Sequence, residues 1–188
     1  MSLAELAVAA ALAWGAGLRA YLVIFAVGLA GYLGYLELPG HLQLLQHPLV
    51  LAASGFMAVV EFFADKLPWL DSVWDAVHTF IRIPAGAALV AAMFTDSGAA
   101  VALGAAILGG TLTAGAHLAK SGTRAAINTS PEPFSNWAAS LSEDALVPFG
   151  LWLAFVKPVL FFVLLAVFAV LAFVFLRMIV RGLRAVFS

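Results

Sequence analysis

Five ionisable residues at helical spacing form an acidic cluster in the first half of the sequence. They are Glu61, Asp65, Asp71, Asp75 and His78. Within each half of the cluster, neighbours stand three or four residues apart, which places side chains on one face of a helix. Clustered carboxylates with an imidazole can bind a divalent cation or relay protons. Asp71, Asp75 and His78 are therefore candidate metal ligands, and helix capping or pairing with nearby basic residues such as Arg82 is the alternative.

Four basic residues form a second cluster from two distant parts of the sequence. They are Arg19, His117, Lys120 and Arg124. Both arginines close a Gly-x-Arg turn, in GLRAYL and in KSGTRAAIN. A flexible turn with free backbone amides beside a guanidinium suits a phosphate or a carboxylate, so the two turns could build one anion site. The arginines could equally anchor the chain to lipid headgroups or act as counter-ions of the acidic cluster.

The polar stretch 127–144 supplies hydrogen-bonding groups at the expected edge of the membrane, and Asn128 is the member closest to the basic cluster in sequence. Such residues can line a pocket or cap helices. The candidate substrate-binding residues of the whole chain are Arg19, Glu61, Asp65, Asp75, His117, Lys120, Arg124 and Asn128.

The composition that surrounds these clusters is that of a membrane protein. Of 188 residues, 64% are hydrophobic and 10% are charged, against about 25% charged in an average soluble domain. Too few charges remain to cover a water-facing surface, so the lipid bilayer is the expected surrounding. A net charge of −1 excludes the basic field that nucleic-acid binding needs, and the lack of cysteine excludes thiolate chemistry. Gly-x-Ser-x-Gly, His-Glu-x-x-His and P-loop motifs are absent, so the motifs favour no enzyme class.

Apolar runs separated by proline, glycine and charge predict an all-α membrane protein with about six transmembrane helices and broken or re-entrant segments, in one polytopic domain over residues 1–188. The runs are 3–14, 18–36, 48–65, 79–95, 99–120, 144–157 and 158–176. The short first run is expected to be re-entrant or interfacial, and the alternative is one long kinked helix over 3–36. Pro158 is expected to separate the last two runs, since proline cannot donate to the helix ladder.

Basic residues between the runs predict the orientation of the chain. Lys66, Lys120, Arg124 and the arginines near the C-terminus fall on one face if the chain crosses six times after residue 17. The positive-inside rule makes that face cytoplasmic, so both termini are expected in the cytoplasm.

Two features suggest how the helices are organised. Residues 48–95 and 99–157 each read as helix, polar loop and helix with a Pro-x-Gly turn, which suggests an internal two-helix repeat. The glycine-rich run 98–116 permits close helix approach, within the bundle or in a homo-oligomer. The uniformly apolar run 158–176 is expected to face lipid.

The pieces GLRAYL, EFFADKLPWLDSVWDAVHTFIR and KSGTRAAINTSPEPFSNWAASLSED resemble an uncharacterised bacterial family of integral membrane proteins that is catalogued as a domain of unknown function. The resemblance covers roughly residues 15–155. It implies a small polytopic helical protein of the bacterial inner membrane, and it implies no activity.

The leading functional hypothesis is transport of a small charged solute, or flipping of a phosphate-bearing lipid, through a site that joins the basic and acidic clusters. A divalent cation or a proton could be the coupling ion. The alternatives are a membrane-embedded, metal-dependent enzyme that acts on a lipid through Asp71, Asp75 and His78, and a structural or assembly protein without a site.

Overall fold

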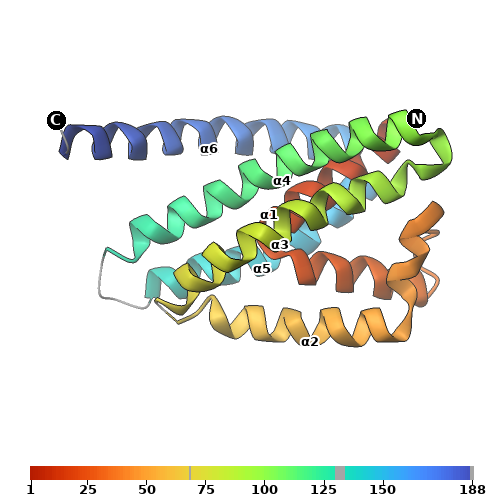
Figure 1. The fold of residues 1–188 in the computed structure, drawn as a ribbon, viewed down its shortest axis with the longest axis horizontal. Helices are drawn as coiled ribbons and strands as arrows, with labels where there is room; N and C mark the ends of the chain where they lie inside the picture. Colours follow the sequence, from red (N-terminus) through yellow and green to blue (C-terminus); the bar gives the residue numbers. More distant parts are fainter. Residues whose placement is uncertain (68, 130–133, 187–188) are drawn as a thin grey trace.

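A computed structural model describes residues 1–67, 69–129 and 134–186 as a bundle of helices (Figure 1). The elements are α1 (Leu3–Tyr32), the 3₁₀ helix η1 (Gly40–Gln46), α2 (Pro48–Ala64), α3 (Leu70–Met93), the 3₁₀ helix η2 (Thr95–Ser97), α4 (Ala99–Ile127), α5 (Phe134–Val156) and α6 (Pro158–Val186). This described part contains no β-strand. The prediction of an all-α protein is therefore confirmed, as is the break before Pro158.

Helix α1 breaks in its middle, at Arg19, where the backbone angles of φ −145° and ψ 72° are not helical. The first half runs along α4, and the Thr113 hydroxyl donates a hydrogen bond to the Ala13 carbonyl. The second half runs back along α2, where Gly55 packs against the ring of Phe25. Helices α2 and α4 start at the same end of the bundle, so both ends of α1 lie at that end (Figure 1). Helix α1 is thus a re-entrant element that turns inside the bundle.

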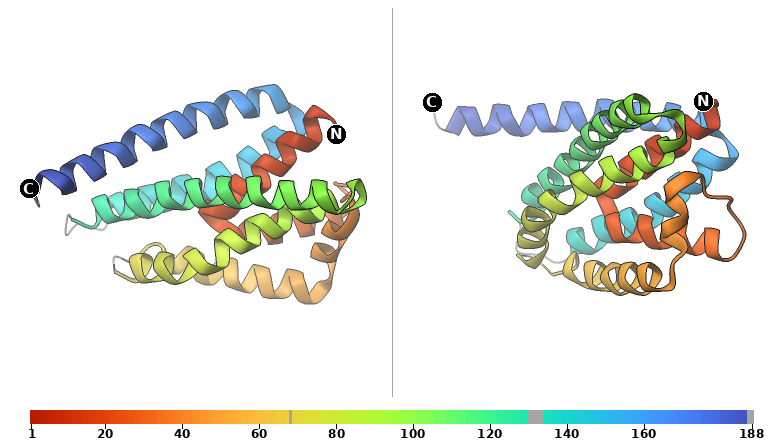
Figure 2. Two further views of the ribbon diagram at one scale, coloured as in Figure 1. Left: turned by 45° about the horizontal axis from the view of Figure 1, so that its top comes forward. Right: turned by 45° about the vertical axis from the view of Figure 1, so that its right-hand side comes forward.

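The turn of α1 changes the predicted topology. The re-entrant segment was expected at 3–14, and the structure extends it to residue 32, so the run 18–36 is its returning half and not a separate span. The N- and C-termini then lie at opposite ends of the bundle (Figures 1 and 2). One expected crossing is thereby replaced by a turn that the contacts of Arg19 hold inside the bundle, and the side of the membrane on which each terminus lies stays a prediction.

The length and apolarity of the helices are those of an integral membrane protein. Five helices, namely α1, α3, α4, α5 and α6, are long and apolar enough to cross a membrane. A sixth candidate is the pair of η1 and α2, which is bent by 70°. Helix α6 is almost entirely exposed along its apolar length, as predicted for a helix that faces lipid, whereas α1 is the most buried helix and contacts all the other α-helices.

The polar stretches that were expected as loops are largely helical. Helix α3 begins at Leu70 instead of residue 79, and α5 begins at Phe134 instead of residue 144. Their first turns direct acidic and amide side chains into the bundle, so apolar periodicity alone starts these helices too late. Helices α2 and α4 run in one direction and α3 and α5 run in the opposite direction, so the two helix pairs have the same orientation (Figure 1). The internal repeat itself stays a prediction.

Close helix packing depends on some of the predicted glycines. A Cβ on Gly109 of α4 would lie 2.7 Å from Val90 of α3, so this glycine allows the two helices to approach. No atom lies within 4 Å of the corresponding position at Gly104 or Gly115. Those two glycines take no part in packing within the described chain.

Candidate functional site

Ten charged side chains meet where α1 breaks, and we call them the ion network. Five are basic and five are acidic: Arg19, Lys66, Arg82, Lys120, Arg124, Glu61, Asp65, Asp75, Glu143 and Asp144. They come from α1, α3, α4, α5 and the C-terminal end of α2. With five charges of each sign the network is formally neutral, which offsets part of the cost of burying charge in a membrane.

Arg82 lies in the deepest part of the ion network, between two carboxylates. Its Nη2 donates to Glu61 Oε1 at 2.6 Å and its Nη1 donates to Asp75 Oδ1 at 2.7 Å. All three side chains are at most 2% exposed. Arg82 Nη1 also donates to His117 Nδ1 at 3.1 Å. An arginine can only donate, so His117 accepts through a deprotonated Nδ1 and is the neutral tautomer that donates from Nε2 to Thr79.

Asp65, the C-cap residue directly after α2, is the centre of the second part of the network. Its Oδ2 lies 2.7 Å from Arg19 Nη1 and 2.5 Å from Lys120 Nζ. Burial raises the pKa of Asp65, but Lys120 and Arg19 outweigh burial and hold this pKa below its ordinary value. Glu143 of α5 lies 3.1 Å from Lys120 and 3.3 Å from Arg124, and it thereby ties α4 to α5.

The break in α1 and the network position each other. Where the first half of α1 ends, its last carbonyls have no partner within the helix. Lys120 donates to one of them, the Leu18 oxygen, at 3.0 Å. Arg19 reaches from the turn to Asp144 at 3.0 Å and to the Ser140 hydroxyl at 2.8 Å. The turn is thus stabilised by charged groups from three other helices, and not by its own sequence alone.

A chain of amide hydrogen bonds extends from the network to the ends of α3 and α4. Arg124 donates to the Asn136 side chain at 3.0 Å, and Asn136 donates to Asn128 at 2.6 Å. Asn128 donates to both oxygens of Asp71, which also accepts from the amide of Ser72. Asn128, predicted as a binding residue, therefore acts as a link between helices.

The three predicted metal ligands go to separate partners. Asp71 binds Asn128, and Asp75 binds Arg82. His78 stacks on Trp74 and bonds its carbonyl through Nδ1. Within residues 1–67, 69–129 and 134–186, no three His, Asp or Glu side chains are grouped so that they could hold a metal ion. The structure therefore does not bring these ligands together.

Two cavities touch the ion network from different sides. One of about 670 Å³ lies between α1, α2 and α5, with apolar walls that include Phe25 and Val59, and it reaches Arg19 and Glu61. The other, of about 270 Å³, lies between α3 and α4 and is lined by polar groups. They are Ser72, Asp75, Thr79, Ser121 and Arg124.

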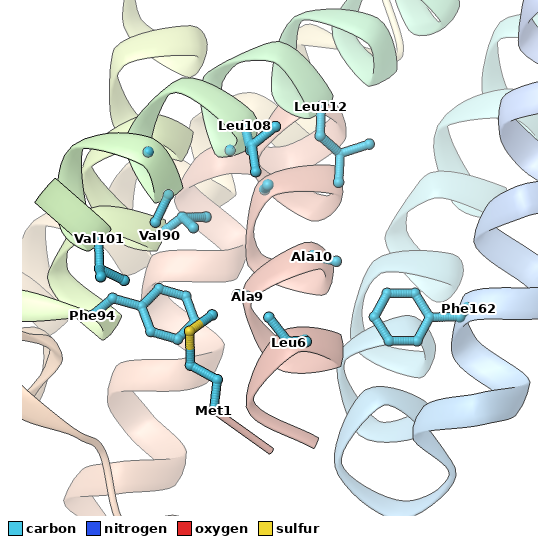
Figure 3. Close-up of a pocket in the computed structure, with 14 residues that line it drawn as sticks. Met1, Leu6, Ala9, Ala10, Val90, Phe94, Val101, Leu108, Leu112 and Phe162 are labelled. Carbon is cyan, nitrogen blue, oxygen red and sulfur yellow. The ribbon is translucent and has the colours of Figure 1, made fainter. Parts of the chain in front are cut away.

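A third cavity, of about 470 Å³, lies at the end of the bundle where α1 starts, and its lining is apolar (Figure 3). Leu6 of α1, Phe94 directly after α3 and Phe162 of α6 are among the residues around it. None of the side chains that line it is charged, so this cavity offers mainly packing space.

Comparison with known proteins agrees with the resemblance seen in the sequence. A model of one family, described as Domain of unknown function (DUF4126), matches residues 6–178. The chain belongs to the DUF4126 family. The match includes the whole ion network and both cavities that touch it. No curated protein and no solved structure matches the chain. The family assignment therefore supports the fold and transfers no activity.

The structure brings together seven of the eight predicted binding residues and adds others. Arg19, Glu61, Asp65, Asp75, Lys120 and Arg124 belong to the ion network, and His117 touches it through Arg82. Sequence reasoning left Arg82 as a pairing partner and overlooked Glu143 and Asp144 as members. The sequence did hold a signal for them, because residues seven or eight apart lie on one helix face. Arg82 follows Asp75 by seven residues, and Glu143 and Asp144 follow Asn136 by seven and eight.

Proposed function

We propose that this protein is a transporter that moves a small charged solute, or a phosphate-bearing lipid, across the membrane through the ion network. The observation that carries the proposal is the break of α1 at Arg19 inside a neutral set of ten charges, seven of which are buried. Discontinuous helices that end at charged groups within the bilayer are the usual construction of transporter sites. Ionisable groups at this depth are costly, and they usually mark a path for ions or substrates.

The mechanism follows from the pairing. In the empty state, Arg19, Lys120 and Arg124 are neutralised by Asp65, Glu143 and Asp144. A phosphate or carboxylate that enters would replace one of these carboxylates as partner, and the displaced carboxylate would take a proton or another cation. Exchange of partners can then shift the equilibrium between two arrangements of the helices.

The cavity between α1, α2 and α5 supports the lipid form of the proposal. Its walls are apolar and its inner end is charged, through Arg19, Glu61 and Asp144. Such a cavity could hold an acyl chain with its headgroup at the network. The end of the bundle that holds Lys66, Lys120 and Arg124 is then the cytoplasmic one, in a bacterial inner membrane. The homo-oligomer stays a prediction.

The test uses the purified protein in vesicles of phosphatidylethanolamine and phosphatidylglycerol with a trace of fluorescent phosphatidylethanolamine. Dithionite added outside bleaches only the outer leaflet, so bleaching beyond the outer-leaflet fraction measures lipid flipping. We expect Ala58→Trp, which fills the cavity beside α2, to stop flipping. The exposed Ala53 on the same helix lies outside that cavity, so Ala53→Trp is the matched control.

Native mass spectrometry of the same protein tests the solute form. A phosphorylated or carboxylated molecule retained by the wild type and lost in Arg124→Gln would support it. If no lipid flips and no anion is retained, the transport proposal is wrong. The structural alternative instead predicts that neutralising substitutions in the ion network lower the free energy of unfolding and change no binding or flux.

A further inference from the structure

Arg82 holds two carboxylates that each keep one unused oxygen. Glu61 binds Arg82 through Oε1, and Asp75 binds it through Oδ1. Within the described residues, no hydrogen-bond donor reaches Glu61 Oε2 or Asp75 Oδ2, although both atoms are buried. A buried carboxylate oxygen without a donor is costly, and a proton on that oxygen removes the charge that causes the cost.

The two carboxylates line different cavities. Glu61 lines the cavity between α1, α2 and α5, and Asp75 lines the polar cavity between α3 and α4. Arg82 lies between them and lines neither. A proton that arrives through one cavity therefore meets one carboxylate first, and the guanidinium separates it from the other.

We infer that Glu61 and Asp75 are the proton-binding pair of this protein and that the proton is the coupling ion of the proposed transport. A proton adds to the free oxygen of either carboxylate and gives a neutral carboxylic acid. Arg82 then keeps its bond to the carboxylate that remains charged. Protonating both at once would leave the buried guanidinium without its two anionic partners, so the pair holds one proton at a time.

The groups around the pair fit this role. The side chains that face it from neighbouring helices are Arg19 and Tyr21 of α1, Asp65 at the end of α2, His78 of α3, and His117 and Lys120 of α4. His117 is held neutral, because its Nδ1 accepts from Arg82. Lys120 lies 3.8 Å from Asp75 and contacts Asp65 more closely, so it does not satisfy the free oxygen. The neighbouring groups therefore leave the free oxygens of the two carboxylates open for a proton.

The experiment is infrared difference spectroscopy of the full chain in lipid nanodiscs during a pH titration. A protonated carboxyl group gives a carbonyl band that a carboxylate lacks. We expect one such band in the wild type from residue 61 and another from residue 75, with a summed intensity of one proton. Glu61→Gln removes the first band and Asp75→Asn removes the second. The exposed carboxylate Glu37 is the control, and Glu37→Gln leaves both bands unchanged.

The double variant Glu61→Gln/Arg82→Gln removes one charge of each sign and so keeps the network neutral. It is used in place of the single variant Glu61→Gln if the single variant does not fold. The band of Asp75 should persist in the double variant. Bands that are unchanged in both single variants, or a summed intensity of two protons, would overturn the inference. The inference rests on the proposed transport only for coupling: if the bands behave as expected but vesicles show no flux, the proton pair stands and the transport proposal fails.

Discussion

Gly17 lies where the first half of α1 makes a close approach to α4, two residues before the break. A Cβ on Gly17 would lie 2.5 Å from the Thr113 carbonyl oxygen and 2.7 Å from the Ala116 Cβ. Ordinary contact begins at 3.4 Å, so Gly17→Ala requires the helices to separate by about 0.9 Å. The obstructing atoms belong to the backbone and a β-carbon, and no change of rotamer can move them away.

The cost of this separation can be estimated from the contacts that it stretches. The hydrogen bonds from Thr113 to the Ala13 carbonyl, at 2.8 Å, and from Lys120 to the Leu18 carbonyl, at 3.0 Å, both cross this interface. Overpacking costs about 1–3 kcal/mol and each lost hydrogen bond about 1 kcal/mol. We therefore expect Gly17→Ala to lower the free energy of unfolding by about 2–5 kcal/mol.

Equilibrium unfolding in mixed micelles, with SDS as denaturant and circular dichroism as readout, measures this difference. Gly115→Ala is the matched control, because nothing lies within 4 Å of its new Cβ. Alanine is the better helix former by about 1 kcal/mol, so the control should be neutral or slightly more stable than the wild type. If the free energies of unfolding of Gly17→Ala and Gly115→Ala differ by less than about 0.5 kcal/mol, the close approach of α1 and α4 is refuted.

Three further predictions follow from the turn and the ion network. The chain has no cysteine, so single cysteines introduced at Ser2, Tyr35 and Thr129 report the topology. A membrane-impermeant maleimide should label positions 2 and 35 from one side of the membrane and position 129 from the other. Labelling of positions 2 and 35 from opposite sides would show that α1 crosses the membrane. Burial raises the pKa of Asp65, but Lys120 and Arg19 lower this pKa by more, so its value in the folded protein lies below the ordinary one. The contribution of Asp65 to stability is therefore complete above about pH 4 and is lost as the pH falls through the lower folded pKa. Asp65→Asn should flatten this acid loss of thermal stability, and an unchanged pH slope would contradict the assignment. Thr113→Val removes the hydrogen bond to α1 and should lower the free energy of unfolding by about 1 kcal/mol in the SDS titration, whereas no change would show that the bond does not stabilise the interface.

Composition and apolar length were enough to predict the bilayer, the helices and the break at Pro158, since each depends on residues close together in sequence. The starts of α3 and α5 were predicted too late for a physical reason. Their first two turns bury Asp71, Asp75, Asn136 and Ser140, and buried polar faces leave no apolar period to detect.

Most pairings within the ion network could not be predicted, because nothing local in the sequence specifies them. Arg19 is 42 residues from Glu61 and 121 residues from Ser140, and contacts at such separations depend on the packed bundle. The pairing of Asp75 with Arg82 was foreseen, because both residues lie on one face of one helix. The turn at Arg19 could not be predicted either, since its partners come from α2, α4 and α5.

The late arrival of these partners also constrains how the chain is made. Ribosomes deliver the N-terminus first, so Arg19 emerges long before Asp65, and longer still before Asp144. An arginine without its counter-ions cannot stay at low cost in hydrocarbon. The first segment must therefore wait near the membrane surface, or beside an insertion factor, until α5 has been synthesised. The most buried helix of the bundle is thus the first to be translated and among the last to reach its native place.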